Sequence, residues 1–349
     1  MKRGRLIFRT AWAAAALLVV SVLLCLCFRG VDFAGLSAAW EELRLPLVFV
    51  AVLLLGLILF VGALEWKLFL PAGNTVSTGR LLKIIAVMGM LQNTLHHFAG
   101  QAFAVVRLGH REKLSKATAL SILAQDQIAE GFARLLWFGF LAIVMAIPAW
   151  ASNGIEWVAL IVIVGYAAAL ALAWRYRNFD DRQPARSAGW GSLGHFIAQW
   201  GYHLRGLRDT RIALLAVLLA VSKKCSKAAA VACVQRSLSI DLPFYAPFLI
   251  VGALDLATMI SIAPGHIGVF EATVKFSYQY LGVDADRALL LALVYHAAYL
   301  VAMVLPGLLV GFSSALARGP SGHAPADPSL ANVVQPREIE TSRSGDLAR

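Results

Sequence analysis

The chain has 349 residues, of which 59% are hydrophobic and only 15% are charged, and its mean hydropathy is +0.71. This composition is too apolar and too poor in charge for an ordinary soluble domain, so it indicates a polytopic membrane protein. The net charge is +11. Basic residues between apolar segments are typical of topology signals and of contact with anionic lipid headgroups, and no nucleic-acid partner is expected.

The N-terminal region predicts two spans. Lys2, Arg3, Arg5 and Arg9 precede an apolar run over 10–28, which is too long for the apolar core of a signal peptide. We therefore expect a retained first helix with a cytoplasmic N-terminus. A second span is expected over 45–64, and the basic residues after it return the chain to the cytoplasm.

The next apolar segment, 81–95, is shorter than the ~20 residues that cross a bilayer. It ends at a break over 96–100, and basic residues from Arg107 onwards follow. The sequence predicts a re-entrant hairpin here, entering through 81–95, turning at 96–100 and leaving through 101–106.

The remaining segments complete an all-α membrane protein with about eight membrane segments, some of them re-entrant or broken. The basic stretch 175–211 is the predicted main cytoplasmic loop, and 191–207 has an amphipathic pattern suited to the membrane interface. We expect one membrane domain over 1–312 and a disordered cytoplasmic tail over 313–349. The other predicted helices cover 118–147, 155–174, 212–234, 244–263, 268–281 and 288–312.

A second break, rich in glycine, lies between two apolar segments at 264–271. Broken backbone at membrane depth is tolerated only where protein or a wet cavity surrounds it, and a break in each half of the chain points to a transporter site. The short helix that starts near Gly265 and Gly268 offers free N–H groups for a phosphate. Alternatively, Glu271 satisfies the N–H of Gly268 and pairs with Lys275 four residues later.

Ionisable residues interrupt two apolar helices. Asp126, Glu130 and Arg134 form one stripe, which is either an internal salt bridge or a group with a lipid-headgroup or proton-linked role. Lys223 and Lys227 lie one turn apart in the segment 212–234. If that segment spans the membrane, these lysines need anions, for which a lipid phosphate is a candidate; if it breaks there, they reach an interface and carry no function.

The usual catalytic and metal-binding patterns do not occur. His96, His97 and His266 lie at the two breaks, but no carboxylate or cysteine stands beside them at ligand spacing. The sequence has no G-x-S-x-G, no P-loop and no H-E-x-x-H. We therefore expect no metal, no cofactor and no catalytic residues.

Taken together, these residues resemble the flippase-like family that shares its membrane region with lysylphosphatidylglycerol synthases. The resemblance extends over roughly 81–312, and its most specific part is the run from Pro264 to Glu271. It implies a role in moving or handling phospholipids, polyprenyl-phosphate sugars or hopanoid-type lipids. The residues that carry it are Asn93, Gly100, Gln101, Ser115, Ala119, Asp126, Glu130, Pro264, Gly265, Gly268, Glu271 and Gly282.

The resulting hypothesis is a lipid translocase or lipid-binding transporter of the bacterial inner membrane, with both termini cytoplasmic. It would move an anionic or isoprenoid-type lipid without ATP, because the chain has no nucleotide-binding motif. The expected substrate-binding residues are Gly100, Gln101, Arg107, Asp126, Glu130, Lys223, Lys227, Gly265, His266, Gly268 and Glu271.

Two rival hypotheses stay open at this point. One is a membrane-embedded lipid-modifying enzyme, in which His266 and Glu271 act as acid and base. The other is a non-catalytic partner of lipid-biosynthesis proteins, with 175–211 as the docking surface.

Overall fold

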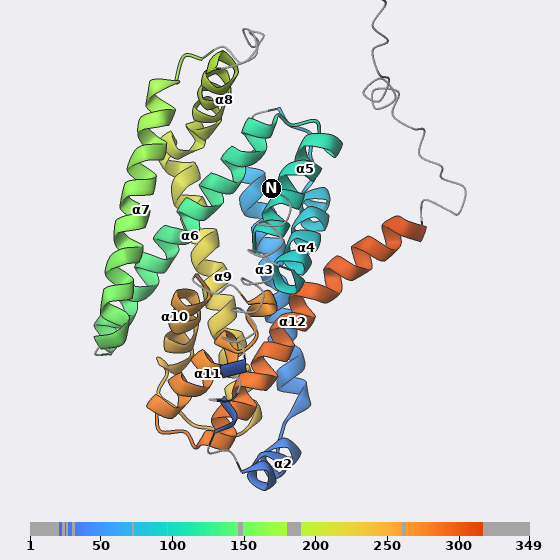
Figure 1. The fold of residues 1–349 in the computed structure, drawn as a ribbon, viewed down its shortest axis with the longest axis vertical. Helices are drawn as coiled ribbons and strands as arrows, with labels where there is room; N and C mark the ends of the chain where they lie inside the picture. Colours follow the sequence, from blue (N-terminus) through green and yellow to red (C-terminus); the bar gives the residue numbers. More distant parts are fainter. Residues whose placement is uncertain are drawn as a thin grey trace, which may run out of the picture. The chain divides into compact units, whose positions relative to one another are not determined.

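The structure is a computed structural model that describes residues 21–22, 25, 27–29, 32–71, 73–95, 97–145, 149–179, 190–259 and 263–316. Every regular element in these ranges is a helix, which confirms the all-α fold (Figure 1). The first predicted span and the predicted tail fall largely outside these ranges. The α-helices are α2 (Phe33–Glu41), α3 (Leu45–Phe69), α4 (Thr78–Thr94), α5 (His97–Arg111), α6 (Lys116–Val144), α7 (Ala149–Arg175), α8 (Trp190–His203), α9 (Thr210–Ser237), α10 (Ala246–Met259), α11 (Val269–Tyr280) and α12 (Ala285–Leu316).

Four of the described helices are long and apolar enough to cross a membrane: Leu45–Phe69, Lys116–Val144, Ile155–Arg175 and Ala285–Ser313. Local signals fix where several helices start. Pro46 occupies the first turn of α3, where the missing N–H costs no hydrogen bond. Ser115 and Asp209 cap α6 and α9 by accepting hydrogen bonds from backbone N–H groups of the first turn.

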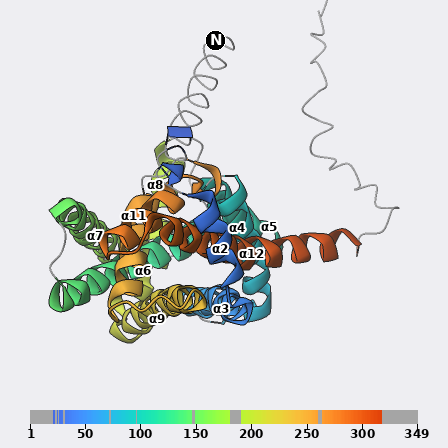
Figure 2. The same ribbon diagram turned by 90° about the horizontal axis from the view of Figure 1, so that it is seen from below.

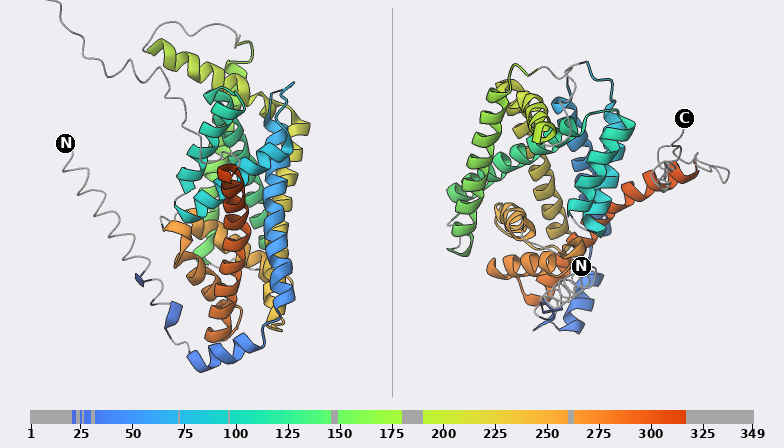
Figure 3. Two further views of the ribbon diagram at one scale, coloured as in Figure 1. Left: turned by 90° about the vertical axis from the view of Figure 1, so that its right-hand side faces the viewer. Right: turned by 45° about the horizontal axis from the view of Figure 1, so that its top comes forward.

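The chain is divided into two compact units, 1–310 and 311–349. Within the first unit, α3 packs along α9, and both lie against α6. The two helices α3 and α9 run side by side in Figures 2 and 3. The main hydrophobic core draws on α3, α4, α6, α9, α10, α11 and α12, so the polar groups of the interior are enclosed by several helices at once.

The first break exists, but its turn lies earlier in the chain than the sequence predicted. Helix α4 ends at Thr94 and α5 already begins at His97, so Gly100 and Gln101 belong to a helix and not to the turn. The two helices pack against each other. A Cβ on Gly100 would lie 2.5 Å from the carbonyl oxygen of Met88, so this glycine allows α5 to approach α4 closely.

The second break has the backbone geometry that its glycines suggested. Helix α10 ends at Met259, and the 3₁₀ turn Pro264–His266 then leads into α11. Gly265 and Gly268 have φ values of 62° and 83°, in the left-handed region that disfavours a side chain. The predicted span 244–263 is therefore a shorter helix of 14 residues.

The two breaks lie next to each other. A Cβ on Gly265 would be 2.9 Å from the carbonyl oxygen of Asn93, near the end of α4. Helix α12 also approaches α4 closely, two turns earlier, since a Cβ on Gly307 of α12 would lie 2.7 Å from the carbonyl oxygen of Ala86. Small residues at such contacts are typical of helix packing inside membranes.

Candidate functional site

Three lysines of α9 carry positive charge into the interior of the helix bundle. Helix α9 runs unbroken from Thr210 to Ser237, so the alternative in which the chain breaks at the lysines is wrong. Lys223 is 6% exposed and Lys224 is fully buried. The side chain of Lys227, one turn after Lys223, remains 25% exposed. Buried ammonium groups require anionic partners, because desolvation of an unpaired charge is very costly.

Lys223 finds those partners on two other helices. Its Nζ lies 2.6 Å from Glu65 Oε2 of α3 and 2.7 Å from Glu130 Oε1 of α6. Asp126 Oδ1, one turn before Glu130, is 3.8 Å away and accepts a hydrogen bond of 3.1 Å from Trp66 Nε1. The predicted acidic stripe of α6 thus faces the lysines of α9, and this contact joins α3, α6 and α9 electrostatically.

The same group of charges continues to α10. Lys224 ion-pairs with Asp255, and its Nζ lies 3.5 Å from Glu130 Oε2. Lys227 Nζ is 3.7 Å from the other oxygen of Asp255. We call Glu65, Asp126, Glu130, Lys223, Lys224, Lys227 and Asp255 the buried charge network.

A small cavity connects the buried charge network with the second break. Its volume is about 60 Å³, and Lys227, Asp255 and His266 line it together with aromatic rings that include Tyr299. Lys227 is the most exposed lysine of the network and faces this cavity. The cavity has room for a few water molecules, which is less than a phospholipid headgroup needs.

Glu271 is held by two partners at the second break. Its Oε2 accepts a hydrogen bond of 2.7 Å from the N–H of Gly268, which confirms the predicted cap. Its Oε1 lies 2.6 Å from His296 Nδ1 of α12. The predicted pair with Lys275 is wrong, because Lys275 Nζ instead donates to the carbonyl oxygens of Cys27 at 2.5 Å and Arg29 at 3.3 Å.

His296 ties this carboxylate to the backbone of the break. Its Nε2 lies 3.0 Å from the carbonyl oxygen of Gly265, which can only accept, so Nε2 must donate. Nδ1 therefore either donates to the Glu271 carboxylate as part of an imidazolium, or accepts from a protonated Glu271. In both cases the pair carries one proton more than an ionised carboxylate beside a neutral imidazole would carry. Phe270 stacks on the imidazole at a centroid distance of 4.2 Å and shields it.

The structure brings some of the predicted site residues together and leaves others apart. Lys227 and His266 line the cavity, but Gln101, Arg107 and Glu271 are not part of its lining. Gln101 and Arg107 lie on α5. Among the described residues, no three His, Cys, Asp or Glu side chains are grouped as metal ligands would be.

Sequence reasoning missed Glu65, Asp255 and His296. Asp255 and His296 each stand as an isolated ionisable residue within a long apolar segment, and this property alone marks a functional candidate in a membrane protein. Glu65 has no such mark, because it follows directly after the predicted span 45–64 and Lys67 stands two residues later. Asp255 in particular lies in the middle of the apolar stretch Ala246–Met259.

One match with a known family shows which family the chain belongs to. A family model described as the lysylphosphatidylglycerol synthase TM region covers residues 12–307. The chain belongs to this family. The lysylphosphatidylglycerol synthase TM region is named for the membrane part of a lipid-modifying enzyme, so the chain is a membrane protein of a lipid-related family. The match includes both breaks and every member of the buried charge network. No curated protein matches the chain.

Proposed function

We propose that the protein is a lipid translocase or lipid-binding transporter of the bacterial inner membrane, which moves an anionic or isoprenoid-type lipid without nucleotide hydrolysis. The observation that carries the proposal is the buried charge network, which reaches a small cavity beside two helix breaks. Ionisable groups inside a membrane domain are costly and normally mark a substrate or ion pathway. Both termini are proposed to be cytoplasmic.

Within the buried charge network, Lys227 is the best candidate to receive a lipid phosphate. Its ion pair with Asp255 is long, at 3.7 Å, and its side chain is partly exposed. A phosphate oxygen entering the cavity would replace Asp255 as the counter-ion of Lys227. Asp255 would keep Lys224 as a partner, so the exchange leaves no carboxylate unpaired.

A headgroup larger than the 60 Å³ cavity requires the site to open. The second break is suited to such movement, because Gly265 and Gly268 tolerate backbone angles that other residues avoid. Hinges of this kind are a few residues at element ends that absorb large changes in φ and ψ. We propose that the arrangement with the 60 Å³ cavity is the closed state of the transporter.

The pair of Glu271 and His296 offers a way to couple opening to a proton gradient. The pair holds one proton, and His296 also holds the carbonyl of Gly265. Loss of the proton would place the Nδ1 lone pair against a carboxylate at 2.6 Å and would weaken the tie to the break. Proton release would therefore favour the open state.

Reconstitution of the full-length protein into liposomes with a fluorescent phosphatidylglycerol tests the proposal. The measured quantity is the rate at which labelled lipid changes leaflet, read from its accessibility to a membrane-impermeant quencher. We expect Lys227→Met to slow this rate and the exposed α4 substitution Lys83→Met, which removes the same charge, to leave it unchanged. Equal rates for the parent, Lys227→Met and empty liposomes would overturn the proposal.

A further inference from the structure

A second, much larger cavity lies where several apolar helices end. Its volume is about 1090 Å³, at the upper end of the range for ligand pockets. The end of α3, Trp174 near the end of α7, the end of α8 and the start of α9 surround it. None of its lining residues lines the small cavity at the second break, so the two cavities are separate.

The polar side of this cavity carries two arginines. Arg208 and Arg211 line it, and Asp209 is the only carboxylate among its lining residues. The Asp209 Oδ1 atom accepts hydrogen bonds from the first backbone N–H groups of α9, at 2.9 Å from Arg211 and 3.4 Å from Ile212. Because this carboxylate already caps the helix, it is the arginines, and not the helix end, that provide an anion site.

Arg208 gives a second, independent indication of a missing partner. Its Nε atom is buried and has no hydrogen-bond partner among the residues that the structure describes. A buried donor without an acceptor is destabilising, whereas the planar guanidinium group matches two oxygens of a phosphate. Because Nε is buried, the Arg208 side chain has to turn toward the cavity before a phosphate between the two arginines can satisfy this donor.

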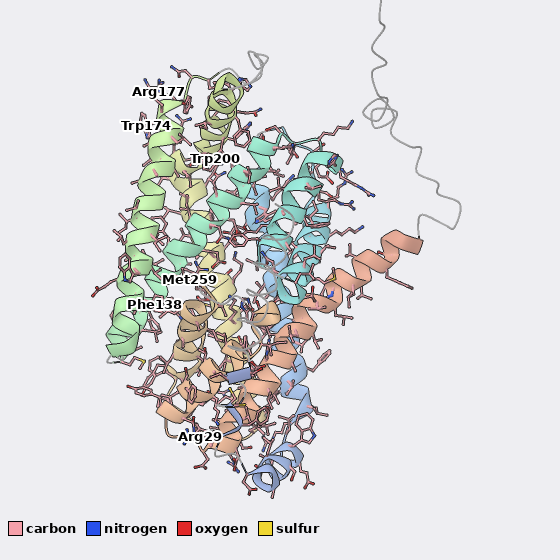
Figure 4. All side chains as sticks on the ribbon, viewed as in Figure 1. Arg29, Phe138, Trp174, Arg177, Trp200 and Met259 are labelled. Atoms are coloured by element: carbon pink, nitrogen blue, oxygen red, sulfur yellow. The ribbon has the colours of Figure 1, made fainter. Side chains whose placement is uncertain are left out.

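The other side of the cavity is apolar and lies at the level where a membrane helix ends. Leu68, Phe69, Leu70 and Pro71 form this wall. Trp174 stands at the end of an apolar helix, as tryptophans do at membrane interfaces, and the guanidinium group of Arg177 lies 5.6 Å from its ring centroid. Figure 4 shows both residues at the end of α7 that lies beside α8.

We propose that this cavity binds the phosphate of an anionic lipid, with the headgroup at Arg208 and Arg211 and the glycerol and acyl carbons against Leu68–Pro71. The site does not depend on the proposed transport function. It also has a defined relation to the buried charge network, because Arg211 and Lys227 lie 16 residues apart on the same helix, which is about 24 Å. A lipid bound here would lie at the start of α9, the helix that carries the three lysines of the buried charge network.

Photo-crosslinking of the full-length protein in nanodiscs tests this site. The discs contain phosphatidylcholine and a few per cent of phosphatidylglycerol with a photoreactive group on its headgroup, and labelled peptides are mapped by mass spectrometry. We expect label within residues 68–71 and 203–212 of the parent. The double substitution Arg208→Gln/Arg211→Gln should reduce it at least about tenfold, the loss expected from one charge-assisted hydrogen bond.

Matched controls separate this result from damage to the fold. Arg236→Gln removes an exposed charge at the other end of α9 and should leave the labelling intact. Arg211→Gln alone changes an exposed side chain and should fold normally with reduced labelling. Equal labelling of the parent, Arg211→Gln and Arg208→Gln/Arg211→Gln would overturn the inference. It would also be overturned if a matched phosphatidylcholine probe labelled the parent as strongly as the phosphatidylglycerol probe.

Two further arms identify the source of the phosphate and the dependence on transport. In the first arm, labelling is repeated in the presence of millimolar glycerol phosphate. Loss of labelling would overturn the assignment to a lipid and assign the site to a soluble phosphate compound. Persistent labelling supports the lipid. Lys227→Met should slow transport without changing the label at residues 203–212. Normal labelling without transport in the parent would refute only the transport proposal, and transport without labelling would refute only this site.

Discussion

Replacing Lys223 with methionine tests the buried charge network most directly. This change removes the ammonium group that lies 2.6 Å from Glu65 and 2.7 Å from Glu130. Glu65 is fully buried, and Lys223 is its only ion-pair partner among the described residues. Removing one partner of a buried ion pair costs about 3–5 kcal/mol, because the other charge is left without compensation.

Lys227→Met is the matched comparison, one turn later on the same helix. It removes one ion pair of 3.7 Å from a side chain that is 25% exposed, so we expect a loss of about 1 kcal/mol or less. At about 2 °C or more per kcal/mol, Lys223→Met should lower the melting temperature by at least about 6 °C and Lys227→Met by about 2 °C. Both are measured in one detergent by intrinsic tryptophan fluorescence.

A double substitution distinguishes lost charge pairing from lost packing. In the Lys223→Met background, Glu65→Gln removes a stranded carboxylate and should recover at least about 1 kcal/mol of the loss. Equal melting temperatures for Lys223→Met and Lys227→Met would mean that Lys223 is not the centre of a buried network. The same conclusion would follow if Glu65→Gln destabilised the parent and the Lys223→Met variant equally.

Three further substitutions test the second break and the N-terminal attachment. Gly265→Ala combines a positive φ with a clash and should cost about 1–3 kcal/mol, more than Gly73→Ala, whose positive φ faces open space; melting temperatures compare them. His296→Leu strands a buried carboxylate, and adding Glu271→Gln should restore part of the lost melting temperature. Lys275→Met removes two backbone ties and should speed amide hydrogen exchange at residues 27–29 while leaving exchange in α9 unchanged.

Each of these substitutions has a result that contradicts its reasoning. Equal melting temperatures for Gly265→Ala and Gly73→Ala would mean that a side chain at position 265 does not clash with the carbonyl oxygen of Asn93. A further loss on adding Glu271→Gln would mean that the carboxylate, through its hydrogen bond from Gly268, stabilises the fold even without His296. Unchanged exchange at residues 27–29 would mean that Lys275 does not hold the N-terminal segment.

The sequence was sufficient for those features that depend on local chemistry. Long apolar segments predicted the helices, and glycine-rich runs predicted the second break. The cap formed by Glu271 followed from its position three residues after Gly268. Each of these interactions is decided within about one turn of the chain, so the residues that decide it are neighbours in the sequence.

The partners across the bundle could not be predicted in this way. Lys223 and Glu65 are far apart in the chain, and nothing in either helix specifies that α3 packs along α9. The expected pair of Lys275 with Glu271 shows the same limit, because His296 from α12 took its place at the carboxylate. Gly100 was assigned to a turn, whereas its small size instead permits the packing of α5 on α4.

The distribution of charge partners indicates which part of the network can exchange them at low cost. All three lysines lie on α9, but their carboxylates come from α3, α6 and α10. Lys223 holds α3 and α6 through two short contacts, so movement there would strand buried charges. Lys227 holds α10 through one long contact, and Asp255 retains Lys224 when that contact is lost. An anion can therefore enter beside α10 and the second break without unpairing the rest of the network, and this is why the proposed headgroup site lies at Lys227 and not at the more deeply buried Lys223.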